Sequence, residues 1–109
     1  MESGEFVVVL TTIPADADPS ALAQALVKER LAACVSVLPP MTSIYRWKGD
    51  VETATERQLV IKTASSKTAE LQQRLLALHS YDVPEFLILP VTGGSDAYLS
   101  WIREACGER

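Results

Sequence analysis

The fold of this chain is decided by the stretch from Ala33 to Thr63, which reads ACVSVLPPMTSIYRWKGDVETATERQLVIKT. Its first strand, Ala33 to Leu38, must break at Pro39-Pro40, because proline has no N–H to donate to a sheet. A second strand, Ser43 to Lys48, leads into the two-residue turn Gly49-Asp50, where glycine stands first as a type II′ turn prefers. The remainder returns as the partner strand, so the stretch predicts a long β-hairpin.

This hairpin is too long to lie within a compact domain. The segment from Ala33 to Lys48 would span about 50 Å if straight, whereas a domain of this size has a radius of gyration of about 13 Å. The predicted arm carries Ile44, Tyr45, Trp47 and Val51, and a two-stranded arm of this kind is marginal alone in water. It also exposes strand edges and apolar surface, which solitary proteins avoid. We therefore expect an oligomer, and closed rings are the common outcome for identical chains.

Two more strands are predicted outside the hairpin. Phe6 to Leu10 is a continuous apolar run, typical of a central strand that is covered on both faces. Phe86 to Val91 is the second apolar segment with strand character.

Three helices complete the pattern. The first begins at Pro19 with Asp18 as its N-cap. The second carries the stripe Leu71, Leu75 and Leu78. The caps predicted for the later helices are Ser65 or Ser66 at the start of the second and Gly107 at the end of the third.

The predicted order is βαββαβ plus a terminal helix. This order indicates an α+β, ferredoxin-like sandwich. Residues 1–109 form a single domain, since neither a repeat nor a separating linker occurs.

Composition excludes several function classes. The net charge of −4 argues against a nucleic-acid binder, which needs a basic face. The sequence has no apolar window long enough for a membrane span, and the N-terminus MESGE lacks the layout of a signal peptide. Cys34 and Cys106 form no CxxC pair, and we expect Cys34 to be a buried apolar residue. These features predict a cytoplasmic protein.

Candidate chemistry is sparse. His79 is the single histidine, and a cysteine nucleophile could only be Cys34, in an apolar strand, or Cys106, near the C-terminus, so we expect no enzyme. Phosphate-binding glycine motifs do not occur. A polar set lies around the hairpin and the last two strands, and its imidazole and carboxylate groups suit a divalent transition metal. It comprises Trp47, Glu56, Lys62, His79, Tyr81, Asp82 and Glu85.

Taken in order, several segments of the chain resemble the CutA family of divalent-cation tolerance proteins. The residues that carry the resemblance are Leu31-Ala32-Ala33-Cys34-Val35, Ser43-x-Tyr45-x-Trp47-x-Gly49, Glu56, Leu59-Val60-Ile61-Lys62-Thr63, His79-x-Tyr81-x-x-Pro84-Glu85 and Tyr98-Leu99-Ser100-Trp101-Ile102.

The resemblance implies a homotrimer linked to copper and other heavy-metal tolerance, with no established catalytic activity. It makes His79 the metal candidate, with copper or another divalent cation weakly bound. Trp47, Glu56, Lys62, Tyr81 and Glu85 are then candidates to line the inter-subunit clefts. The chain departs from the family pattern at Thr11, Leu78 and Ser80, where some relatives carry a cysteine, a histidine and a proline.

A second interpretation stays open. A trimer shaped like the PII-type regulators would hold a small anion or a protein partner in the same clefts, using Lys62 and Arg46. An uncharacterised enzyme is the third alternative, although the sequence offers no catalytic pair.

Overall fold

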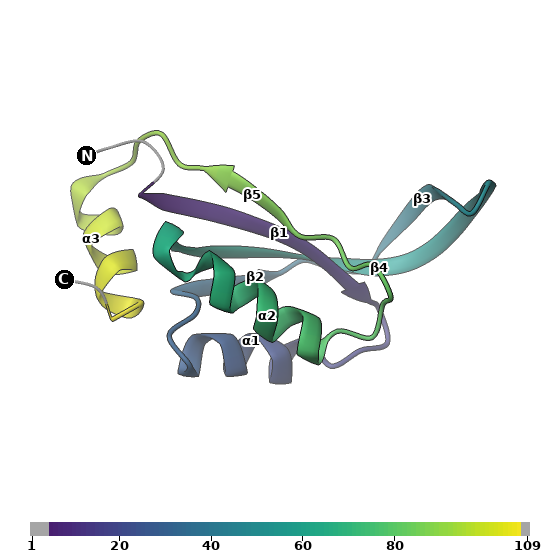
Figure 1. Cartoon of the computed structure of the whole chain (residues 1–109), viewed down its shortest axis with the longest axis horizontal. Helices are drawn as coiled ribbons and strands as arrows, with labels where there is room; N and C mark the ends of the chain where they lie inside the picture. Colours follow the sequence, from purple (N-terminus) through teal and green to yellow (C-terminus); the bar gives the residue numbers. More distant parts are fainter. Residues whose placement is uncertain (1–4, 108–109) are drawn as a thin grey trace.

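The computed structural model describes residues 5–107, so the ends of the predicted domain 1–109 and most of the N-terminal MESGE segment lie outside it. A single sheet forms one layer of the molecule, and two helices, α1 (Pro19–Lys28) and α2 (Thr68–Leu78), form the other (Figure 1). The third helix, α3 (Asp96–Ala105), packs at the end of the sheet far from the hairpin arm. This arrangement confirms the α+β fold class.

The sheet has the predicted ferredoxin-like topology. Its path runs β2-β4-β1-β5, with β3 also paired to β4, and every neighbouring pair is antiparallel. Because Pro39-Pro40 interrupts the first arm of the hairpin, β2 and β3 lie one after the other along β4. The strands are β1 (Phe6–Pro14), β2 (Cys34–Val37), β3 (Met41–Trp47), β4 (Asp50–Ala64) and β5 (Leu87–Pro90).

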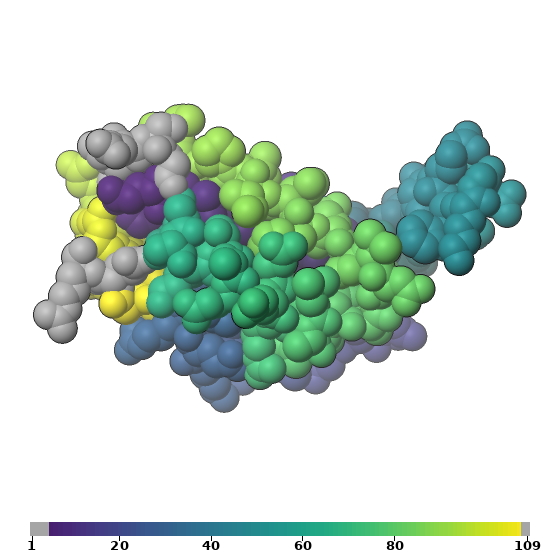
Figure 2. Space-filling view, viewed as in Figure 1, coloured from purple at the N-terminus to yellow at the C-terminus, as the bar shows by residue number. Residues whose placement is uncertain are grey.

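The hairpin formed by β3 and the first half of β4 projects beyond the body of the molecule (Figure 2). The radius of gyration is accordingly 14.7 Å, and the molecule extends over 45 × 26 × 23 Å. The predicted turn was wrong by one residue. Trp47 pairs with Asp50, which leaves Lys48 and Gly49 as the central residues, with φ of 50° and 87°. Positive φ at both positions is the requirement of a type I′ turn rather than type II′.

The helix ends follow the predictions in two cases out of three. The Asp18 carboxylate accepts hydrogen bonds from the Ser20 and Ala21 amides at the start of α1, and Gly107 follows α3 with φ of 74°. The predicted serine cap of α2 was wrong, because a 3₁₀ turn over Ser65–Lys67 precedes the helix and puts Lys67 at its N-cap position.

The main core lies between the sheet and the first two helices. Val9, Leu59 and Ile61 point from the sheet into it and are fully buried, while Leu71 and Leu75 enter it from α2. The third residue of that predicted stripe, Leu78, ends the helix and is exposed. A smaller cluster joins α3 to the sheet through Phe6, Ala33, Ala64, Leu99, Ile102 and Cys106.

The opposite face of the sheet carries an apolar stripe, defined here as Val8, Leu10, Val60, Leu87 and Leu89. Strand register aligns Leu10 with Val60 on one side and Leu87 on the other, and it places Val8 beside Leu89. Leu87 and Leu89 are 54% and 44% exposed, and the other three are half-buried.

Within one chain, α1 and α2 cover one face of the Phe6 to Leu10 strand, and α3 covers the other face only at Phe6, so the predicted cover on both faces is incomplete. The strand also continues to Pro14. Cys34 belongs to the same less covered face, beside Lys62, and is half-buried rather than buried.

Candidate functional site

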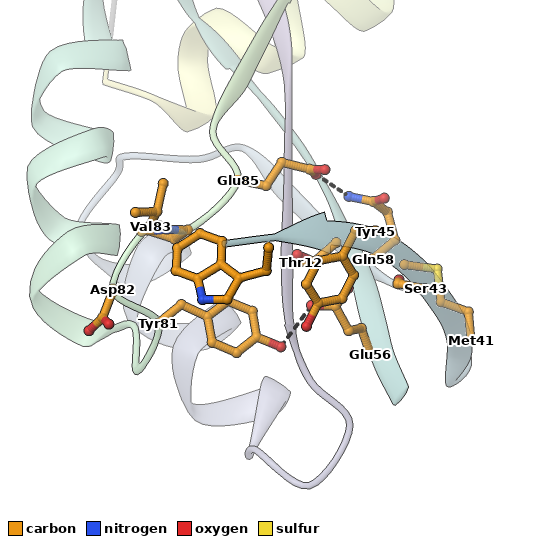
Figure 3. A pocket seen from close by; sticks show the side chains of 12 residues that line it. Thr12, Met41, Ser43, Tyr45, Glu56, Gln58, Tyr81, Asp82, Val83 and Glu85 are labelled. Carbon is orange, nitrogen blue, oxygen red and sulfur yellow. Dashed lines mark hydrogen bonds between the residues drawn. The ribbon is translucent and has the colours of Figure 1, made fainter. Parts of the chain in front are cut away.

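A cavity of about 550 Å³ lies where the hairpin joins the body of the molecule and meets the segment after α2 (Figure 3). One wall comes from β3 and β4, and the other from residues 81–85. The lining residues are Thr12, Met41, Ser43, Tyr45, Trp47, Glu56, Gln58, Tyr81, Asp82, Val83, Pro84 and Glu85.

Strand alternation explains why these side chains meet. Side chains two residues apart on a strand point to the same face, so Tyr45 and Trp47 of β3 share a face, as do Glu56 and Gln58 of β4. Thr12 pairs with Gln58 across the sheet. The connection from α2 to β5 then crosses this face and closes the cavity.

Two carboxylates of the cavity are held by neutral donors. The Tyr81 hydroxyl donates to Glu56 Oε2 at 2.7 Å, and Gln58 Nε2 donates to Glu85 Oε2 at 2.9 Å. Glu56 is only 8% exposed. Within residues 5–107 neither carboxylate has a cationic partner, since the ion pairs there are Glu29 with Arg74 and Glu5 with Arg103.

The pKa of Tyr81 is raised well above its ordinary value, first by burial and then by its hydrogen bond to the Glu56 carboxylate. The folded state therefore holds the phenolic proton more tightly than the unfolded chain does. This linkage stabilises the fold below the unfolded pKa of 10.0, and the benefit is lost as the pH rises from there towards the folded pKa.

We expect Tyr81→Phe to be less stable than the parent chain at neutral pH, by about 1–3 kcal/mol, because Glu56 loses a hydrogen bond. Between about pH 9 and pH 11 the difference in free energy of unfolding between the two proteins should become smaller, because only the parent chain has this phenolic proton to lose. The narrowing stays below about 1.4 kcal/mol per pH unit, since one proton is involved and the phenol is partly solvated. Urea unfolding at several pH values measures both effects, and parallel pH profiles for the two proteins would contradict the assignment.

The ring nitrogens of His79 form hydrogen bonds within its own chain. Its Nε2 lies 2.5 Å from the Thr12 carbonyl oxygen, which only accepts, so Nε2 carries the proton. Its Nδ1 accepts the Tyr81 backbone N–H at 3.1 Å. Both ring nitrogens are thus used in this conformation. In this conformation the ring fixes the start of the 79–85 connection, and the metal role of His79 stays a prediction.

Lys62 does not lie in the cavity either. Its ammonium donates to the Tyr98 hydroxyl at 3.2 Å, and this bond raises the Lys62 pKa. Of the residues predicted for the cleft, the structure brings together Trp47, Glu56, Tyr81 and Glu85. It adds Thr12 and Gln58, which sequence reasoning missed, although Gln58 stands two residues after Glu56 on the same strand.

The three departures from the family pattern are not among the residues that line this cavity. The Thr11 side chain is completely buried, and its hydroxyl finds no hydrogen-bond partner among residues 5–107. Leu78 and Ser80 line a second, smaller cavity of about 290 Å³ together with His79.

None of the helices in the described part of the chain has the length and apolar character needed to cross a bilayer.

Comparison with known proteins identifies the relatives of this chain. The model of the CutA1 divalent ion tolerance protein family matches residues 7–105. The divalent-cation tolerance protein CutA of Thermus thermophilus is 47% identical over 92% of this chain and 97% of its own length. Protein CutA, chloroplastic, of Arabidopsis thaliana is 43% identical over 91% of this chain, which spans only 54% of that relative.

The fold agrees with these matches. The solved structure of CutA from Synechococcus elongatus superposes with a TM-score of 0.89 at 39% identity, covering 97% of this chain and 94% of that one. The chain therefore belongs to the CutA1 family of divalent ion tolerance proteins.

Proposed function

We propose that this chain acts in divalent-cation tolerance as a cytoplasmic homotrimer, by binding rather than by catalysis. Copper or another divalent cation is held weakly in clefts between subunits, to which each chain contributes the cavity at the base of its hairpin. The observation that carries the proposal is the pair of carboxylates, Glu56 and Glu85, that line one cavity without a cationic partner in residues 5–107.

The apolar stripe supports the assembly. A face that keeps apolar side chains partly exposed on three adjacent strands needs a cover. The Phe6 to Leu10 run at its centre also has the continuous apolar character of a strand buried on both sides. The projecting hairpin adds Ile44 and Val51, which are 71% and 66% exposed. Copies of the same chain in a closed ring would bury both surfaces.

The number of ligands supports a shared cation site. Carboxylate oxygens suit divalent cations, but residues 5–107 contain no group of three or more His, Cys, Asp or Glu side chains arranged to hold a metal. One chain thus offers an incomplete and weak site, and the neighbouring subunit supplies the missing ligands.

The alternative of a small anion in this cavity is disfavoured by its charge. Three acidic residues, Glu56, Asp82 and Glu85, line the cavity, and none of the lining residues is lysine or arginine. Arg46, the other cation proposed for an anion, donates instead to the Gly49 carbonyl at the tip of the hairpin.

Calorimetric titration with copper and zinc tests the cation site. We expect Glu56→Gln to weaken the affinity about tenfold or more, because the variant keeps the shape of the side chain and removes its charge. Glu70→Gln, which changes an exposed carboxylate in the first turn of α2, serves as the matched control and should bind as the parent chain does. Equal affinities for all three proteins would refute the site, and unchanged binding by His79→Ala would exclude His79 from it.

A further inference from the structure

We infer that the cavity at the base of the hairpin also binds a compact organic ammonium compound, with Tyr45, Trp47 and Tyr81 against its alkyl groups and Glu56 and Glu85 against its charge. The inference goes beyond the proposed metal site. It concerns the same cavity and the same carboxylates, and it adds the aromatic lining and the volume, which a metal ion does not use.

The first feature is the sign of the charge. The carboxylates of Glu56, Asp82 and Glu85 line the cavity, and no basic residue is among the lining side chains. A low-dielectric hollow lined by one sign of charge favours ligands of the opposite sign. The occupant is therefore a cation.

The second feature is the burial of Glu56. With 8% of its surface exposed, this residue is more than nine-tenths buried, and its carboxylate has one neutral hydrogen bond, at Oε2. Within residues 5–107 its Oε1 has no hydrogen-bond partner. Because Oε1 is not among the fully buried unpaired atoms, it opens to the cavity, where a bound ammonium group would pair with it.

The third feature is the aromatic lining. The π-face of tryptophan or tyrosine attracts cations, and groups of such rings are a recurrent way to bind quaternary ammonium. The Trp47 ring already interacts with a cation of its own chain, since Lys48 Nζ lies 5.8 Å from its centroid. Tyr81 is fixed by its hydroxyl bond to Glu56, and Figure 3 shows Tyr45 lining the same hollow.

The fourth feature is size. A volume of about 550 Å³ lies within the range of small-molecule pockets, and it far exceeds the roughly 30 Å³ of a water molecule. The apolar side chains of Met41, Val83 and Pro84 also line it. Such walls suit methyl and methylene groups, so the ligand class is an alkylated ammonium rather than a hydrated metal ion.

Choline and its neutral isostere 3,3-dimethylbutan-1-ol provide the test, with NMR titration of the native protein in amine-free phosphate buffer. We expect choline to shift the Trp47 indole and Tyr81 amide signals saturably, and the isostere to bind at least about fivefold more weakly. Equal affinity for the two compounds, or no saturable shift with choline, would overturn the inference.

Substitution of the aromatic wall separates this site from the metal site. Trp47→Leu should weaken choline binding about 5- to 30-fold, because it removes an aromatic face, whereas Glu56→Gln should weaken the binding of choline and of the metals together. Trp47→Phe, which keeps an aromatic face, should retain most of the binding. Trp101→Leu is the matched control, because Trp101 is equally exposed (42% against 40%) and lies on α3 outside the cavity. Unchanged choline affinity in Trp47→Leu would refute the inference even if metal binding is confirmed.

Discussion

Replacing Leu87 and Leu89 together by glutamate is expected to reduce the particle from three chains to one, with a mass of 11.9 kDa. Both side chains are about half exposed within the single chain, so the subunit itself loses little when they change. In the proposed trimer they belong to the apolar stripe that a neighbouring subunit covers. The substitution would bring like charges together at that interface, which costs several kcal/mol. Light scattering after size-exclusion chromatography measures the mass directly.

Leu76→Glu is the matched control for this experiment. Leu76 is 52% exposed, close to the 54% of Leu87, but it lies on α2, which packs against the other face of the sheet. We expect this variant to keep the mass of the parent chain. A trimer that survives the double substitution would show that the stripe is not the interface, and a monomeric parent chain would refute the proposed assembly itself.

The sequence predicted the topology well because its strongest signals are local. Pro39-Pro40 interrupts the first arm of the hairpin whatever surrounds it, and Asp18 before Pro19 marks the start of a helix by its own hydrogen bonds. The turn was misplaced by one residue because both central positions have positive φ and one of them is Lys48, a residue type that sequence rules do not favour there.

The apolar run in the first strand illustrates a different limit. Its pattern correctly indicated two apolar faces, but a sequence cannot say whether the second face is covered by its own chain. The structure shows Val9 buried against the helices and Leu10 only half-buried on the other side. The incomplete cover of this second face within one chain therefore supports a neighbouring copy of the chain against it.

The sequence predicted only part of the candidate site, because some of its contacts join residues that are distant in the sequence. Strand alternation places Glu56 and Trp47 from the sequence, but the role of His79 depends on which atoms surround its ring. The Thr12 carbonyl comes from a strand far away in the sequence, and only the folded chain shows that it accepts the hydrogen bond from the Nε2–H group. The same contact fixes the path of the 79–85 connection and thus the wall of the cavity.

Ile61→Ala should destabilise the chain by about 2–5 kcal/mol, a large part of the 5–15 kcal/mol that stabilises a typical domain. Ile61 is fully buried on β4, between Val9 and Val35 in register, and it packs in the main core with residues of both sheet-facing helices. Truncation removes apolar contacts and leaves a cavity that the neighbouring strands cannot fill. Ile61→Val removes one methylene group and should cost about 0.5–1.5 kcal/mol. Urea unfolding gives both free energies.

Val51→Ala on the same strand provides the contrast that links stability to assembly. Val51 is 66% exposed on the hairpin arm, so in a dilute, dissociated chain its truncation should change the free energy of unfolding by less than about 0.5 kcal/mol. If neighbouring subunits cover the arm, the stability that Val51→Ala removes must increase with protein concentration, because association stabilises the folded chain by mass action. The loss in Ile61→Ala should not depend on concentration in this way, since its contacts lie within one subunit. A Val51→Ala loss that stays small at every concentration would therefore remove the arm from the interface while leaving the core assignment intact.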